Sequence, residues 1–120
     1  MCMVNPNQDN LDKLDSIAYK VVVKKRDNNF KYYTPWREAE FNDTLEAEGD
    51  PNIFYSDIFY RMTLHGGAIH CYRELNKALT VSSHFDDTVV LKVKGINPIA
   101  YNKREIAFKK IKVIEEIIKI

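Results

Sequence analysis

Alternating apolar and polar positions near the start of the chain predict a β-hairpin. Four apolar side chains, at every second position, would share one face of a strand over residues 17–25: Ile17, Tyr19, Val21 and Val23. The Asp and Asn residues at 27–29 are typical of a turn, because their side chains bond nearby backbone and tolerate positive φ. Residues 30–34 then predict the returning strand.

A helical spacing of apolar residues predicts the longest helix over residues 51–64. Three apolar residues recur every four positions and would form a stripe: Phe54, Ile58 and Met62. Asp50-Pro51 is typical of a helix start, since Asp accepts bonds from free amides and Pro is tolerated in the first turn. Gly66-Gly67 would end this helix.

Shorter elements are expected downstream. Residues 68–72 predict a short strand, and residues 73–80 predict a short helix. Residues 88–94 alternate apolar and polar positions and predict a half-exposed strand. Residues 95–101 contain a glycine and a proline and predict a loop.

The last segment supports two interpretations. Asn102-x-x-Glu105 resembles a capping box, which would begin a helix. The same segment is rich in β-branched residues, and its apolar residues also occur in alternating pairs: Ile106 with Phe108, and Ile111 with Val113. We favour a strand over 105–115, with a helical turn after it.

Length and composition indicate one small domain. The chain has 120 residues, a mass of 14.0 kDa and 45% apolar residues, enough to bury roughly two-thirds of its unfolded surface. Residues 1–16 are polar and would form a loose lead-in, with a short helical turn near Leu11 and Leu14. Residues 17–120 would form a single α+β domain, mainly an antiparallel sheet with the two helices.

The charge balance limits the classes of partner. Lys plus Arg is 18 and Asp plus Glu is 17, so the net charge of +1 argues against binding of a nucleic-acid polymer. Acidic residues gather at 38–57, where we expect a solvent-exposed, mobile connection. A cation site is the alternative for this segment, but no calcium-loop spacing is present. Basic residues gather at 92–112, a distribution that suits a small polyanion or the pairing of two subunits.

The sequence contains no marker of membrane insertion or export. No apolar run approaches the ~20 residues of a membrane helix, and no signal peptide is recognisable at the N-terminus. Two cysteines, Cys2 and Cys71, are too few for a disulfide framework. We therefore expect a reduced, cytoplasmic protein that does not bind membranes.

Residue patterns typical of enzymes are missing. His70 and Cys71 would point to opposite faces of a strand, so they would not share a metal ion. Ser82-Ser83-His84 lacks a nucleophile elbow and is interpreted as a polar loop between helix and strand. Gly66-Gly67 lacks the other residues of a phosphate loop. We expect no catalytic residue, no metal and no cofactor.

Aromatic residues repeatedly adjoin basic ones along the chain. Aromatic rings stack on nucleic-acid bases, worth roughly 1–3 kcal/mol for each base, and arginine matches phosphate bidentately. Asparagine side chains would bind the edges of a base or ribose. This reasoning gives nine candidate ligand-binding residues: Phe30, Arg61, His70, Tyr72, Arg73, Phe85, Asn97, Asn102 and Arg104.

Three segments of the C-terminal half also give a resemblance: residues 66–72, 89–94 and 105–114. They resemble small phage and mobile-element proteins that have a Gly-x-x-His turn, a Val-rich strand and a Lys-Ile-rich terminal strand. Chain size and the Tyr, Arg and Asn content are similar to the first type of Thoeris anti-defence proteins, which sequester the cyclic ADP-ribose signal of bacterial TIR-domain immunity. The resemblance implies an oligomeric sponge, at least a dimer, in the host cytoplasm. No ligand residue of that family is assigned to a position here.

The leading hypothesis is therefore non-enzymatic sequestration of a small phosphorylated nucleotide, to block bacterial immunity. One alternative is a protein-interaction module that inhibits a host factor through the acidic 38–57 segment or an exposed sheet edge. Another is an enzyme that processes NAD or an ADP-ribosyl group, with His70 and Tyr72 on one strand face and a Glu as the acid.

Overall fold

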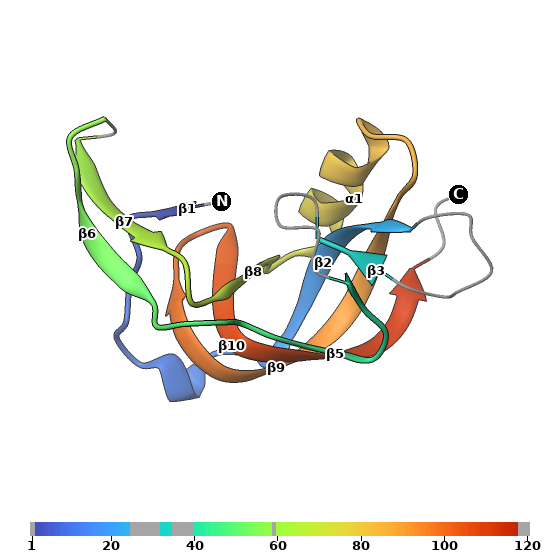
Figure 1. Ribbon diagram of the computed structural model, residues 1–120, viewed down its shortest axis with the longest axis horizontal. Helices are drawn as coiled ribbons and strands as arrows, with labels where there is room; N and C mark the ends of the chain where they lie inside the picture. Colours follow the sequence, from blue (N-terminus) through green and yellow to red (C-terminus); the bar gives the residue numbers. More distant parts are fainter. Residues whose placement is uncertain (1, 25–31, 35–39, 59, 118–120) are drawn as a thin grey trace.

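The computed structural model describes residues 2–24, 32–34, 40–58 and 60–117. Every strand pair among these residues is antiparallel, and one α-helix accompanies the strands, which is an α+β arrangement. In chain order (Figure 1) the described elements are β1 (Cys2–Val4), the 3-10 helix η1 (Leu11–Lys13), β2 (Ile17–Lys24), β3 (Tyr32–Tyr33), β4 (Glu40–Phe41), β5 (Thr44–Glu46), β6 (Asn52–Ser56), β7 (Arg61–His65), β8 (Ile69–Tyr72), α1 (Leu75–Ser83), β9 (Thr88–Tyr101) and β10 (Glu105–Ile117).

Four strands pair in a closed ring. β2 pairs with β9, β9 with β10, β10 with β8, and β8 returns to β2 through the single pair Tyr72 and Tyr19. Closing so few strands requires strong curvature, and β9 and β10 bend visibly along the base of the molecule (Figure 1). Their register shifts between Ala107 and Phe108 and between Val113 and Glu115, and such irregularities increase bending and twist.

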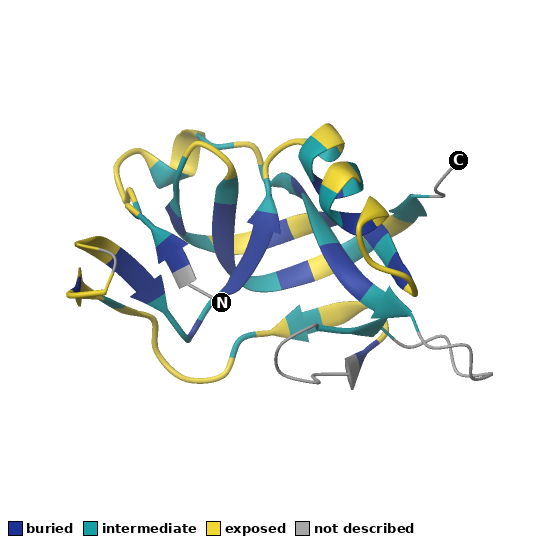
Figure 2. Cartoon of the chain, turned by 90° about the horizontal axis from the view of Figure 1, so that it is seen from above, coloured by how far each residue is buried: buried dark blue, intermediate teal, exposed yellow. Residues whose placement is uncertain are grey.

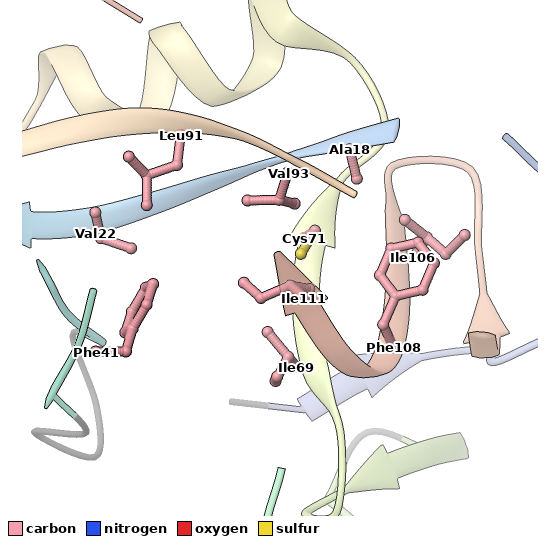
Figure 3. Packing of buried hydrophobic residues seen from close by; sticks show 10 residues of the cluster. All are labelled: Ala18, Val22, Phe41, Ile69, Cys71, Leu91, Val93, Ile106, Phe108 and Ile111. Atoms are coloured by element: carbon pink, nitrogen blue, oxygen red, sulfur yellow. The ribbon is translucent and has the colours of Figure 1, made fainter. Parts of the chain in front are cut away.

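The interior of the ring holds the main hydrophobic core. Side chains from the four ring strands and from β4 converge there (Figure 3): Ala18, Val22, Phe41, Ile69, Cys71, Leu91, Val93, Ile106, Phe108 and Ile111. Phe108 is the largest fully buried side chain. A Cβ placed on Gly95 of β9 would lie 2.1 Å from its ring, so the aromatic ring packs where the opposite strand has no side chain.

Helix α1 covers the outer face of β2 and β9. Ala78 is fully buried against Val21 and Val90, with Leu75 and Leu79 packed beside them. β2 and β9 face the ring interior on one side and α1 on the other. Both strands therefore carry apolar residues on both faces. The short helix expected over 73–80 is confirmed, and it continues to Ser83.

A second sheet, with the strand order β1-β7-β6, projects from the ring, and we call it the wing. Its base packs Met3 and Leu64 against Ala100 and Ala107 on the outside of β9 and β10. Its far end, the β6–β7 hairpin, extends away from α1 (Figure 1) and is mainly exposed (Figure 2).

The helix expected over 51–64 is wrong, because β6 and β7 form a hairpin there. The three residues of the expected stripe are exposed, so a helix would have had no core to cover: Phe54, Ile58 and Met62. In the strands, Ile53 lies opposite Leu64 and joins it in the core at the base of the wing. Gly66 and Gly67 have φ values of 64° and 59° and reverse the chain after a strand, not after a helix.

The loop expected over 95–101 is also wrong, since β9 continues to Tyr101. Gly95 lies in the strand because of its contact with Phe108, and Asn97 takes a φ of 55° just before Pro98, at an irregular part of the pairing. The strand favoured over 105–115 is confirmed as β10, whereas the helical turn after it falls mainly on residues 118–120, outside the described part.

The remaining expectations concern the N-terminal half. The strand at 17–25 is confirmed as β2, and its hairpin partner is β3, although the turn at 27–29 lies outside the described residues. The segment 1–16, expected to be a loose lead-in, contains β1 and η1. The acidic segment 38–57, expected to be a mobile connection, contains β4, β5 and β6, and most of its described side chains are exposed, as expected.

Gly95→Ala should destabilise the protein strongly, because the added methyl group would overlap the Phe108 ring. We expect a loss of about 2–3 kcal/mol in the free energy of unfolding, measured in urea. Adding Phe108→Leu to Gly95→Ala should recover part of that loss, whereas Phe108→Leu alone should destabilise. Equal stability of Gly95→Ala and the wild type would contradict this packing.

Candidate functional site

The turn between β9 and β10 is built around the side chain of Asn102. Its Oδ1 accepts hydrogen bonds from the backbone amides of Arg104 (2.9 Å) and Glu105 (2.8 Å), and its Nδ2 donates to the carbonyl of Val4 (3.0 Å). The Asn102 side chain, which the sequence suggested as a helix cap, therefore stabilises a turn instead, since Asn side chains accept from turn amides as well as helix amides. Its bond to Val4 also connects this turn to β1. Lys103 and Arg104 are exposed in this turn.

Arg73 connects the end of β8 to the same turn. Its guanidinium lies over the ring of Tyr101, with Cζ 5.4 Å from the ring centroid, and its Nη1 donates to the carbonyl of Asn102 at 2.9 Å. Its backbone amide donates to the carbonyl of Arg104 at 2.9 Å. The exposed guanidinium is thus oriented by a ring and a carbonyl. It has five N–H donors in all.

A cavity of about 300 Å³ lies beside Arg73, between the chain after η1, the start of α1 and the β9–β10 turn. It is lined by Leu14, Asp15, Ile17, Arg73, Glu74, Lys103 and Ile106. The lining combines two cationic, two carboxylate and three aliphatic side chains. Asp15 is already oriented, because its Oδ1 accepts the backbone amide of Ile17 at 2.9 Å.

A second group of polar side chains lies where β2, β8 and β10 meet. The Nζ of Lys20 donates to the carbonyl of His70 at 2.8 Å, and burial lowers the pKa of Lys20. His70 Nδ1 is 3.8 Å from Glu105 Oε2, and in the described chain neither of these two atoms has a hydrogen-bond partner. Tyr72 lies opposite Glu105 in the pairing, and its pKa is raised by burial first and by Glu105 second.

Cys71 lies in the ring interior and is a poor nucleophile. The pKa of its thiol is raised to about 11, chiefly by burial, with Lys20 opposing the shift and Glu105 adding to it. A thiol with this pKa is almost entirely protonated near neutral pH. The Cys71 side chain is buried in the main core.

The structure brings together only part of the nine candidate residues. Arg73, Asn102 and Arg104 meet at the β9–β10 turn, and of these only Arg73 lines the cavity. His70 and Tyr72 are neighbours on β8 but lie outside the cavity lining.

The other candidates are dispersed. Arg61 is exposed at the start of β7 in the wing, and Phe85 is exposed just after α1. Asn97 is exposed within β9, and Phe30 lies outside the described residues. A single site could not contain all nine residues.

Sequence reasoning missed several residues of both groups. Lys103 lies between the candidates Asn102 and Arg104 but was not itself a candidate, and Asp15 and Leu14 were placed in a polar lead-in that gave no sign of a cavity. Lys20 could have been found, because it lies between Ala18 and Val22 on the inward face of a strand. A lysine at such a position must place its amine against a polar atom.

No set of three or more His, Cys, Asp or Glu residues in the described chain is arranged to hold a metal ion. In the same part of the chain, no helix is long and apolar enough to cross a membrane. No family model, no curated protein and no solved structure matches this chain. The fold alone therefore defines its class: a small antiparallel β ring with one covering helix and a projecting wing.

The buried thiol gives a direct chemical test. In a Cys2→Ser variant, Cys71 should react with a thiol reagent only after denaturation, since at about pH 8 only about 0.1% would be thiolate. Absorbance of the released chromophore, followed with and without denaturant, measures this. Rapid labelling of the native variant would place Cys71 outside the core.

Lys20 should make stability depend on pH. Burial lowers the pKa of Lys20 in the folded protein below the ordinary value of 10.5. At a pH between the folded pKa and 10.5, Lys20 is protonated in the unfolded chain but not in the folded one, so the free energy of unfolding rises with pH. Urea unfolding at about pH 7 and about pH 10 should show the wild type gaining stability relative to Lys20→Met as the pH rises. Lys112→Met, at an exposed site, should show no such gain. A constant difference between wild type and Lys20→Met would refute the buried amine.

Proposed function

We propose that this protein binds a small phosphorylated nucleotide in the cavity beside Arg73 and does not transform it. The observation that supports this is the composition of the cavity lining, which offers cationic, carboxylate and aliphatic side chains within about 300 Å³. A nucleotide carries a group for each of these: phosphate oxygens, ribose hydroxyls and an apolar base face. Inorganic phosphate would use only the cations.

Arg73 and Lys103 are the residues that would contact phosphate. Tyr101 and the Asn102 carbonyl orient the guanidinium before any ligand arrives, and one Nη1 bond leaves other donors for phosphate oxygens. Lys103 lines the same cavity as Arg73. Each charge-assisted bond of this type contributes about 1.5–3 kcal/mol.

Asp15 and Glu74 would accept hydrogen bonds from ribose hydroxyls, while Leu14 and Ile17 would contact the base. The cavity lies at the lower end of the roughly 300–1,000 Å³ typical of ligand pockets. That volume favours a mononucleotide or part of a dinucleotide over a nucleic-acid polymer. Cyclic ADP-ribose, which the resemblance implies, is the ligand of this chemistry to test first.

Binding without catalysis is supported by the location of the reactive side chains. The cavity is lined by the carboxylates Asp15 and Glu74 but by no histidine or cysteine, since His70 and Cys71 lie outside it, as does Glu105. His70 and Cys71 are buried, and the raised pKa of Cys71 opposes thiolate formation. The proposal therefore assigns these residues to the fold.

Thermal unfolding with added ligand tests the proposal. Cyclic ADP-ribose, ADP-ribose and AMP are compared with inorganic phosphate, each at high concentration. A ligand at 100 times its dissociation constant adds about 2.7 kcal/mol of stability, which should raise Tm by roughly 10 °C. We expect at least one nucleotide to do so and phosphate to have little effect.

Substitutions locate the site in the same experiment. Arg73→Gln and Lys103→Gln should each weaken binding at least about tenfold, the loss of one charge-assisted bond. Lys112→Gln removes the same charge from an exposed position outside the cavity and should change affinity less than about twofold. The absence of any nucleotide effect, or equal losses in all three variants, would refute the proposed site.

A further inference from the structure

The wing carries most of the exposed large apolar side chains of the described chain. Eight such residues are exposed in total, and five belong to the β6–β7 hairpin: Phe54 (40%), Tyr55 (55%), Ile58 (82%), Tyr60 (79%) and Met62 (44%). Clusters of this kind on a small protein mark a contact surface. None of the five lines the cavity beside Arg73, so the surface is separate from the proposed nucleotide site.

The apolar surface continues the core outward along one face of the wing. Leu64 of β7 is fully buried against Met3, and Ile53 lies opposite Leu64 in the strand pairing. Two positions further out, Tyr55 lies opposite Met62 on the same face, and both are exposed. Side chains on one strand face recur every second residue, so this face is a single apolar strip that is only half covered.

β6 is also the outer edge of its sheet. In the described residues it pairs with β7 on one side only, and its register with β7 is continuous over all five residues. Edge strands are usually protected by lysine, proline or a bulge. The sequence Asn-Ile-Phe-Tyr-Ser contains no charge and no proline, so β6 lacks these protections.

The sequence of β6 is complementary to its own reverse. Asn52 and Ser56 are polar ends, and Ile53, Phe54 and Tyr55 form an apolar centre. Two antiparallel copies with Phe54 at the two-fold axis would place Ile53 against the partner's Tyr55, and the polar ends against each other. Pairs of aromatic and β-branched residues are favourable across strands.

We propose that a second copy of this chain binds the wing by pairing its β6 antiparallel with β6 of the first, with the two-fold axis at Phe54. The two wings then form one continuous sheet with the order β1-β7-β6-β6-β7-β1. Such an interface is isologous, as in most homodimers. It goes beyond the proposed nucleotide site and does not depend on it.

The available area indicates a dissociable dimer. At their stated exposures the two aromatic side chains of β6, Phe54 and Tyr55, leave roughly 200 Å² uncovered in each copy. Ile58 and Met62 and the strand edge bring each side toward the roughly 600 Å² at the lower limit of stable interfaces. Acidic Asp50 and Asp57 flank the strand, so association should strengthen as salt screens them.

Sedimentation at about 1 µM and about 100 µM tests the proposal, because mass action favours a dimer at the higher concentration. The wild type should shift from mainly monomer to mainly dimer. Tyr55→Lys should remain monomeric, since it places a charge beside the partner's Ile53. Tyr60→Lys makes the same change at a more exposed position in the turn, outside β6, and should still dimerise. Circular dichroism and the unfolding midpoint verify that both variants fold.

A disulfide test locates the axis. In the Cys2→Ser background, Phe54→Cys should form a covalent dimer on oxidation, because only a residue at the axis meets its own copy. Tyr60→Cys should not. A wild type that stays monomeric at about 100 µM, equal loss of dimer in both lysine variants, or faster cross-linking at position 60 would overturn the proposal. These outcomes leave the nucleotide-binding variants unaffected, so the two proposals can fail separately.

Discussion

The packing of Phe108 on Gly95 is the contact on which the rest of the fold depends. A ring of four strands has little internal space, and Phe108 is the largest fully buried side chain. It fits because its ring packs on Gly95 of β9, which has no side chain, and a single added carbon there would overlap the ring. A glycine within a strand is also a position where the strand can bend sharply. This pair, together with the two register shifts between β9 and β10, therefore allows the curvature that closes the ring.

The closed ring positions both surfaces to which we assign function. β8 and β9 end just before Arg73 and Asn102, and hydrogen bonds between these two residues and Arg104 fix the β9–β10 turn beside the cavity. The outside of β9 and β10 supplies Ala100 and Ala107, small residues on which the base of the wing packs. The wing is thus attached by its base alone, and its far end remains available for contact.

Sequence reasoning could predict the elements whose local pattern agrees with their tertiary environment. β2, β10 and α1 follow from β-branched alternation and from a helical stripe that does meet a core. The hairpin at 52–65 could not be predicted, because Phe54, Ile58 and Met62 fit a helical period, and only the absence of a covering core decides against it. The continuation of β9 through Gly95 and Pro98 depends on Phe108, which is distant in sequence.

The candidate site was predicted in part for a similar reason. Neighbouring aromatic and basic residues led to Arg73, Asn102 and Arg104, since these lie near one another in two short segments. Asp15 and Leu14 reach the cavity only through the path of the chain after η1, which no local pattern encodes. His70 was a candidate by residue type, and its burial beside Glu105 shows that type alone does not indicate exposure.

Native-state hydrogen exchange tests the central claim, that a rigid ring carries a wing attached only at its base. Amides of β2, β9 and β10 should exchange only through global unfolding, whereas those of the far part of the β6–β7 hairpin should exchange through a smaller opening in dilute solution. Gly95→Ala should lower the protection of the whole ring together. Equal protection of wing and ring in the wild type, or fast exchange confined to β9 and β10, would contradict it.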